Sequence, residues 1–219
     1  MKYVIMCGGD YDTFEIPKQL TVVNGESLVD RTIRLLKENG ITDIYISTND
    51  DRFRGKAPLL KHYNSYKVVN EVIKGYWLDA FYPGFAPSDR ITYLFGDVYY
   101  SEKAIKTIVE VESKENILVG NSVAKNPEHH NIGEPFAYIV NDYKTFMEGI
   151  RKVKELFREG KVKRNPLVWE LYRYLNGLDI NIQDIQDNYI AIDDETIDVD
   201  TPEEAEKLAN NDSKSKVRW

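Results

Sequence analysis

Short runs of apolar and β-branched residues alternate, in the first half of the chain, with segments whose apolar positions recur every three or four residues. The short runs are typical of strands, and the longer period is typical of amphipathic helices. The predicted strands are residues 3–6, 44–47, 91–95 and 117–119, and the predicted helices are residues 28–37 and 104–111. Such alternation predicts a layered α/β fold around a mostly parallel sheet.

The second half continues with longer helical periods. It predicts strands at residues 136–140, 181–185 and 189–192, and helices at residues 143–157, 167–175 and from residue 202 onward. Ser27 with Asp30 predicts a capping box at the first helix, and Thr201 with Glu204 predicts one at the last. We expect one domain over residues 1–210 and a flexible, polar tail over residues 211–219.

Composition narrows the class of protein. The 219 residues carry 29 Lys and Arg against 36 Asp and Glu, a net charge of −7, which argues against nucleic acid as a partner. Cys7 is the one cysteine, so an intramolecular disulfide is impossible and a reducing compartment is favoured. The apolar start, residues 1–7, is too short for a signal peptide or membrane span, so we expect a cytoplasmic protein with no membrane partner.

The first strand runs into a glycine pair, Gly8 and Gly9, after Cys7, and the following loop ends at Pro17 and Lys18. Glycines at the carboxyl end of a first parallel strand let backbone amides approach an anion, although an ordinary turn has the same composition. An ammonium held at Lys18 is suited to contact a phosphate.

Two further segments carry carboxylates. Gly96 and Asp97 follow an apolar strand, where Asp97 offers a hard oxygen ligand for Mg²⁺ unless it caps the next helix, a role for which Ser101 is better placed. Near the C-terminus, extended geometry puts Asp198 and Asp200 on one face of the chain. Both could also be solvated residues that lead into the last helix.

These three segments together resemble the nucleotidyltransferase superfamily that activates sugar phosphates and related phospho-alcohols. The resemblance implies a single-domain, three-layer αβα fold of the GT-A, Rossmann-like type with a mixed, mostly parallel sheet. It implies Mg²⁺ on Asp97 and Asp200, with Asp198 in reserve, and catalytic roles for Lys18 and Asp97. The nucleotide-binding positions it implies are Cys7, Gly8, Gly9, Lys18, Gly75, Asp79 and Gly96.

The chain departs from the family pattern in the first loop. Residues 10–15 contain three acids, with no second glycine and no arginine, so positive charge must reach a triphosphate from Lys18 and a metal ion. The segment of residues 70–80 is an approximate counterpart of the family's base-recognition segment and leaves the base open. Residues 17–19 (Pro-Lys-Gln) and the short chain slightly favour CTP or UTP over the other nucleotides.

The acceptor is expected in the second half. Glu134, where a long loop enters a strand, could bind a hydroxyl or amine, and Lys163 and Arg164 could hold an acceptor phosphate. The three histidines and the single cysteine have no zinc-ligand spacing.

The sequence therefore predicts a Mg²⁺-dependent enzyme that joins the NMP unit of an NTP to a sugar phosphate or small phospho-alcohol and releases pyrophosphate. A role in making surface-polysaccharide precursors follows from the resemblance alone. Two alternatives stay open, a GT-A glycosyltransferase and a non-catalytic nucleotide or sugar-phosphate sensor, the latter favoured by the acidic loop.

Overall fold

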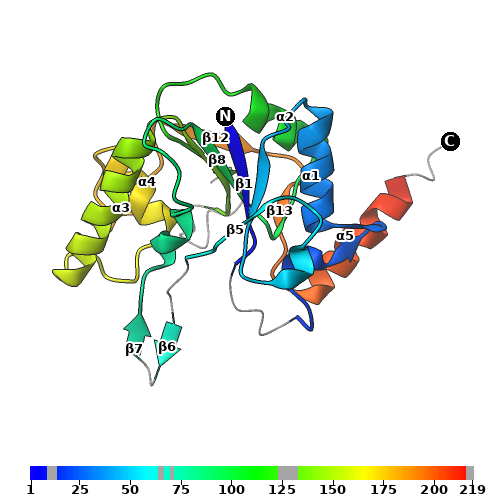
Figure 1. Ribbon diagram of the computed structural model, residues 1–219, viewed down its shortest axis with the longest axis horizontal. Coiled ribbons are helices and arrows are strands. Elements are labelled where there is room, and N and C mark those ends of the chain that lie inside the picture. The colour runs from blue at the N-terminus through cyan, green and yellow to red at the C-terminus, as the bar shows by residue number, and fades with distance from the viewer. Residues whose placement is uncertain (9–13, 64–66, 70–71, 123–132, 216–219) are drawn as a thin grey trace.

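The computed structural model describes residues 1–8, 14–63, 67–69, 72–122 and 133–215. Gly9 and most of the acidic loop lie outside these residues. Within them a seven-stranded sheet forms the middle layer, in the order β12-β10-β11-β8-β1-β4-β5 (Figure 1). Its strands are β1 Lys2–Met6, β4 Ile44–Ser47, β5 Leu59–Leu60, β8 Ile91–Phe95, β10 Ile117–Asn121, β11 Pro135–Val140 and β12 Tyr189–Ile192.

The sheet is mixed and mostly parallel. β1 pairs in parallel with β4 and β8, and β10 pairs in parallel with β12, whereas β11 runs antiparallel to both of its neighbours, β8 and β10. The carboxyl ends of the parallel strands therefore meet at one edge, where open α/β sheets bind ligands. The start of β11 lies at this same edge.

Helices cover both faces of the sheet, which confirms the three-layer αβα architecture expected from the sequence (Figure 1). α1 Leu28–Glu38 and α2 Glu102–Glu110 lie on one side, and α3 Tyr143–Arg158 and α4 Val168–Leu175 on the other. α5 Pro202–Ser215 lies beyond α1, against the hairpin of β2 and β3. The described residues also form short 3-10 helices at Lys18–Leu20, Asp51–Phe53 and Trp77–Phe81. Three small two-stranded sheets complete the fold. They pair β2 Val22–Val23 with β3 Glu26–Ser27, β6 Lys67–Val69 with β7 Val72–Lys74, and β9 Val98–Tyr99 with β13 Ile197–Asp198.

Both predicted N-caps are present, and the one at Thr201 is a complete capping box. The Ser27 hydroxyl accepts the Asp30 amide at 3.2 Å and donates to the Asp30 carboxylate at 2.6 Å. The Thr201 hydroxyl accepts the Glu204 amide at 3.3 Å, and the Glu204 carboxylate accepts the Thr201 amide in return at 3.0 Å. α5 continues to Ser215, past the point where the sequence predicts the tail to begin.

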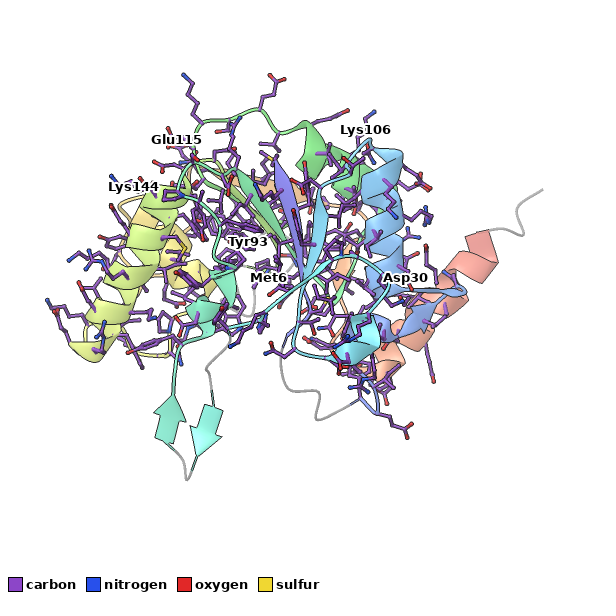
Figure 2. All side chains as sticks on the ribbon, viewed as in Figure 1. Met6, Asp30, Tyr93, Lys106, Glu115 and Lys144 are labelled. Carbon is purple, nitrogen blue, oxygen red and sulfur yellow. The ribbon has the colours of Figure 1, made fainter. Side chains whose placement is uncertain are left out.

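The core between the sheet and α3 is aromatic. Phe146 of α3 packs against Phe81 and Tyr138, with ring centroids 5.3 and 4.9 Å away, and Tyr93 packs on Phe81 at 5.0 Å. Figure 2 shows Tyr93 and Met6 between the helical layers, whereas Lys106 and other charged side chains project from the surface. Aromatic pairs of this kind stabilise a core beyond their buried area.

One predicted strand, residues 181–185, is wrong. Asp179 accepts the Asn181 amide through its side chain at 2.9 Å and the Ile182 amide through its carbonyl, which closes a turn. The carbonyl of Ile182 is then held by the buried Arg173 guanidinium at 2.7 Å, so the backbone is occupied without a strand neighbour.

Candidate active site

Lys18 contacts two carboxylates at the ligand-binding edge of the sheet. Its ammonium nitrogen lies 2.7 Å from Asp97 and 2.8 Å from Asp200, although the three residues are far apart in the sequence. Pro17 precedes the 3-10 helix that Lys18 begins, and Thr21 donates its amide to the Lys18 carbonyl, so the backbone at Lys18 is fixed on both sides. The expected proximity of Asp97 and Asp200 is therefore found around a shared cation.

Gly96 brings Asp97 to this edge. The Gly96 amide donates to the Met6 carbonyl at 3.0 Å, so the chain after β8 stays against the end of β1. A Cβ at position 96 would lie 2.6 Å from the Met6 carbonyl oxygen and 2.7 Å from the Cys7 sulfur, which only glycine avoids. Ser101, not Asp97, caps α2, since its hydroxyl accepts the Ala104 amide at 2.8 Å.

The C-terminal aspartates reach the site through β13. Asp198 is paired with Val98 of β9, and the Val199 amide donates to the Asp97 carbonyl at 3.0 Å. The chain leaves the strand after Asp198, so the predicted alternation fails beyond it: Val199 is buried, whereas Ile197 is exposed. Glu204 of the capping box accepts the Asp200 amide at 2.8 Å and fixes the backbone there.

The site has more negative than positive charge. Burial and then the nearby Asp97 carboxylate raise the pKa of Asp198 to about 8, although Lys18 acts to lower it. Burial would lower the pKa of Lys18, but Asp97 and Asp198 outweigh it and raise that pKa. The ammonium is therefore permanently charged and holds the acidic cluster together.

Glu134 belongs to the same electrostatic cluster, and it lies just before β11. Its amide donates to the Asn121 side chain at 2.8 Å, and its carbonyl accepts the Asn121 amide, so β10 clamps this corner. Burial raises the pKa of Glu134, and Asp200 and Asp97 add to that rise. Asn121 is a positioning residue that the sequence analysis did not identify.

The carboxylates suit a hard divalent cation. Asp97 and Asp200 already share one cation, Lys18, and one oxygen of the mostly buried Asp198 has no hydrogen-bond partner among the described residues. Mg²⁺ in phosphate-binding sites takes one or two carboxylates and completes its shell with water and phosphate oxygens. Among the described residues, no group of three or more acidic, histidine or cysteine side chains is arranged to hold a metal ion.

Two of the predicted nucleotide-binding residues, Asp79 and Gly75, contact other parts of the protein. Asp79 forms an ion pair with Lys154 of α3 at 2.5 Å and lines a pocket of about 200 Å³ on that side of the molecule. Gly75 has a positive φ of 80° and offers its carbonyl to the Asn165 side chain at 3.1 Å. The structure does not bring Asp79 to the Lys18 cluster.

The predicted acceptor-phosphate residues form a separate pocket. Lys163 and Arg164 line a cavity of about 210 Å³ with Glu170 and Arg173, and among the described residues its lining includes neither Lys18 nor Asp97. Arg164 is already paired with Glu170 at 2.9 Å, and the buried Arg173 is paired with the same carboxylate at 3.0 Å. Among the described residues, the lining of this pocket does not include Glu134 either.

Cys7 and Gly8 follow β1 beside the cluster. The Cys7 thiol is buried, and burial and then Asp97 raise its pKa, which favours the protonated thiol. Gly8 packs against the ring of His62. No motif in the sequence marks His62, which has no zinc-ligand spacing to the other histidines or to Cys7. His62 follows the two-residue strand β5, which was too short to be predicted.

In the described residues, none of the helices is long and apolar enough to span a membrane. No protein-family model matches the chain, and no curated protein matches its sequence. Solved structures do match it over nearly their whole length.

The chain is similar to CTP:phosphocholine cytidylyltransferase from Streptococcus pneumoniae, with a TM-score of 0.53 and 16% identity over 96% of this chain and 98% of that chain. It is similar to UDP-glucose pyrophosphorylase from Acinetobacter baumannii, with a TM-score of 0.60 and 12% identity over 96% and 92% of the two chains. It is also similar to 4-diphosphocytidyl-2C-methyl-D-erythritol synthase from Anaerococcus prevotii, with a TM-score of 0.60 and 12% identity over 97% and 95%. The chain therefore shares its fold with these three enzymes, as expected from the resemblance of its motifs.

Proposed function

We propose that this protein is a Mg²⁺-dependent nucleotidyltransferase that joins the NMP unit of an NTP to a phosphorylated small molecule. The observation that carries the proposal is the Lys18 ammonium held between Asp97 and Asp200 at the ligand-binding edge of this fold. The fold neighbours named for cytidylyl transfer and for UDP-glucose formation support the general reaction.

In this reaction a phosphate oxygen of the acceptor attacks the α-phosphorus of the NTP. A new P–O bond forms, the bond between the α-phosphorus and the bridging oxygen breaks, and pyrophosphate leaves with the electron pair. No covalent bond to the protein is required, so the side chains contribute positioning and charge stabilisation.

Lys18 is the proposed phosphate contact. With a nucleotide bound, its ammonium exchanges a carboxylate for phosphate oxygens and stabilises the charge that develops during transfer. Asp97 and Asp200 would hold Mg²⁺, which supplies charge neutralisation at the phosphates when bound. Asp198 is the proposed reserve ligand for the metal ion. Glu134, whose carboxyl group interacts with Asp97 and Asp200, is the proposed contact for the acceptor.

The identity of the substrates is a finer proposal. CTP or UTP is the proposed nucleotide and a sugar phosphate or phospho-alcohol the proposed acceptor, in the supply of surface-polysaccharide precursors. Gly8, Gly9 and Gly96 would face the nucleotide, whereas Gly75, Asp79, Lys163 and Arg164 remain weaker assignments because the structure gives them other contacts. The single cysteine fits a reducing compartment, and we propose the cytoplasm.

Pyrophosphate release from CTP, UTP, GTP and ATP with a panel of phospho-sugars and phospho-alcohols tests the function. Pyrophosphate release is expected with one nucleotide and one class of acceptor, and it should require Mg²⁺. The variants Asp97→Asn and Asp200→Asn should not release pyrophosphate. An Asp142→Asn variant is the matched control, because Asp142 is an exposed helix cap of α3. Consumption of a nucleotide sugar without pyrophosphate would instead identify a glycosyltransferase.

A further inference from the structure

His62 is a buried polar residue that lies at the ligand-binding edge without a role in the reaction as described so far. Its side chain is buried, with 6% of the residue exposed. Its backbone is clamped to Asn49, whose side chain donates to the His62 carbonyl at 2.9 Å and accepts the His62 amide at 3.2 Å. The ring is therefore held in one place.

The ring lies directly against Gly8. A Cβ at position 8 would come within 2.1 Å of Cδ2 and 2.2 Å of Nε2 of His62. Only glycine leaves room for the ring, so the side of the imidazole that carries Nε2 faces the turn after β1. This turn is the start of the loop that the sequence assigns to the nucleotide.

Only one of the two ring nitrogens is paired. Nδ1 lies 3.0 Å from the Ser47 hydroxyl, whereas Nε2 has no hydrogen-bond partner in the part of the chain that the structure describes. Burial lowers the pKa of His62 to about 4, so the imidazole is neutral near pH 7. A neutral imidazole has one donor and one acceptor nitrogen, and leaving either one buried and unpaired is unfavourable.

The position of His62 indicates which part of a nucleotide it faces. Asp97 follows β8, Gly8 follows β1, Ser47 is the last residue of β4 and His62 follows β5, so His62 lies across β1 from the charged cluster. Neighbouring strands are about 4.8 Å apart, and the ring packs on Gly8 after β1, one strand away from β8, which leads to Asp97. A neutral group beside the charged cluster, and not within it, suits the uncharged half of the nucleotide.

We propose that His62 is a nucleotide-binding residue whose Nε2 hydrogen-bonds the nucleoside half of the bound NTP and sets its position over Gly8. This inference rests on the proposed function for the presence of a nucleotide. It assigns the unpaired nitrogen a partner that arrives with the substrate.

Two substitutions separate the two nitrogens. His62→Asn keeps a polar atom near the position of Nδ1, for Ser47, and removes Nε2, whereas His62→Gln places an amide near Nε2 and gives up the contact with Ser47. Titration calorimetry with Mg²⁺ and each of the four NTPs is expected to show about tenfold weaker binding for His62→Asn and near wild-type binding for His62→Gln. Unchanged binding in His62→Asn, or equal weakening in both variants, would overturn the assignment.

A second measurement needs no substitution. In nitrogen-15 spectra of the wild-type histidines, the Nε2 resonance of His62 is expected to move when the preferred nucleoside monophosphate binds and to stay in place with inorganic pyrophosphate. The proposal is overturned if the Nε2 chemical shift does not change with the nucleotide, or if it changes equally with pyrophosphate. Wild-type protein that binds an NTP but releases no pyrophosphate would refute the proposed reaction and leave this test intact, while binding of none of the four would refute both.

Discussion

Lys18 is the residue on which the charge balance of the site depends. It lies among three aspartates and a glutamate, and it is the cation that contacts Asp97 and Asp200 together. An ammonium in this position keeps the carboxylates close before a substrate arrives. It is also close enough to the strand ends to contact the phosphates of a bound nucleotide.

Lys18→Ala is expected to lower the rate of pyrophosphate release by about 10² to 10³, because a positioned charge donor is removed from the transition state. Circular dichroism should show an unchanged fold. Lys106→Ala is the matched control, since Lys106 is an exposed lysine of α2 with a 3.8 Å ion pair to Glu110. Equal rates for the two variants would make Lys18 a structural counterion only.

Asp198 gives the folded protein a distinctive dependence on pH. Its folded pKa of about 8 exceeds the usual value near 4, so between these limits the folded state binds a proton that the unfolded state does not. The free energy of unfolding should therefore fall as the pH rises from about 4 to about 8. His62, with its pKa lowered to about 4, acts in the opposite direction below its usual value of 6.5.

The useful window is pH 6.5 to 8, where His62 is neutral in the folded state and its remaining titration in the unfolded state is common to the wild type and to Asp198→Asn. Urea unfolding in chelator should show wild-type stability falling across this window and a smaller fall in Asp198→Asn. The difference between the two proteins should be greatest at pH 8. Parallel curves for the two proteins would show that Asp198 ionises normally.

At the scale of elements, the contact between β8 and the end of β1 decides where Asp97 lies. Gly96→Ala is expected to destabilise the protein by about 1–3 kcal/mol, because the new methyl group meets the Met6 carbonyl and the Cys7 sulfur, and rigid backbone cannot yield easily. The rate of pyrophosphate release should fall with it, as Asp97 is displaced.

Gly149→Ala in α3 is the matched control for this prediction. Its methyl group would meet Leu175 Cδ2 at 2.7 Å, the end of a side chain that can rotate, and alanine is favoured in a helix by about 0.5–1 kcal/mol. Thermal unfolding should show little change for Gly149→Ala and a clear loss for Gly96→Ala. Similar losses would mean that the β1–β8 contact is as adaptable as the helix packing.

Most elements could be predicted because their apolar positions have a clear period. The predicted strand of residues 44–47 matches β4, and the predicted helix of residues 143–157 ends one residue before α3 does. The strand predicted at residues 181–185 failed because Asp179 and Arg173 capture backbone groups there, and the two residues of β5 are too few to show a period.

The site was predictable where a motif carries it and not where only tertiary contacts do. Lys18, Asp97 and Asp200 came from motifs and meet in the structure. Asp79 and Arg164 also looked available for ligands, but their partners, Lys154 and Glu170, are fixed by helix packing that no local pattern reveals. His62 became visible only through its contact with Gly8.

At the scale of the whole molecule, negative charge dominates both the chain and the site. The net charge is −7, and three aspartates and Glu134 surround one lysine. A triphosphate would be repelled from this cluster without added cations. The acidic loop of residues 10–15 contributes three carboxylates to the net charge of the chain.

Nucleotide binding should therefore depend strongly on Mg²⁺. Calorimetric titration of the preferred NTP is expected to show much weaker binding in chelator than in Mg²⁺, and the dependence should diminish in Asp97→Asn, which removes one of the carboxylates. The exposed-cap variant Asp142→Asn should keep the wild-type dependence. Comparable affinities of the wild-type protein with and without the metal would contradict the arrangement proposed for the site.

The pairing of β13 with β9 has a consequence for how the protein is made. Asp97 lies in the first half of the chain, whereas the strand that brings Asp198 and Asp200 to it comes after every strand of the central sheet. During synthesis the ribosome will have released most of the sheet before these aspartates emerge from its tunnel. Lys18 and Asp97 can then meet early, whereas the complete set of carboxylates assembles last, so any nascent or prematurely terminated chain that has not reached Asp200 has an unfinished active site.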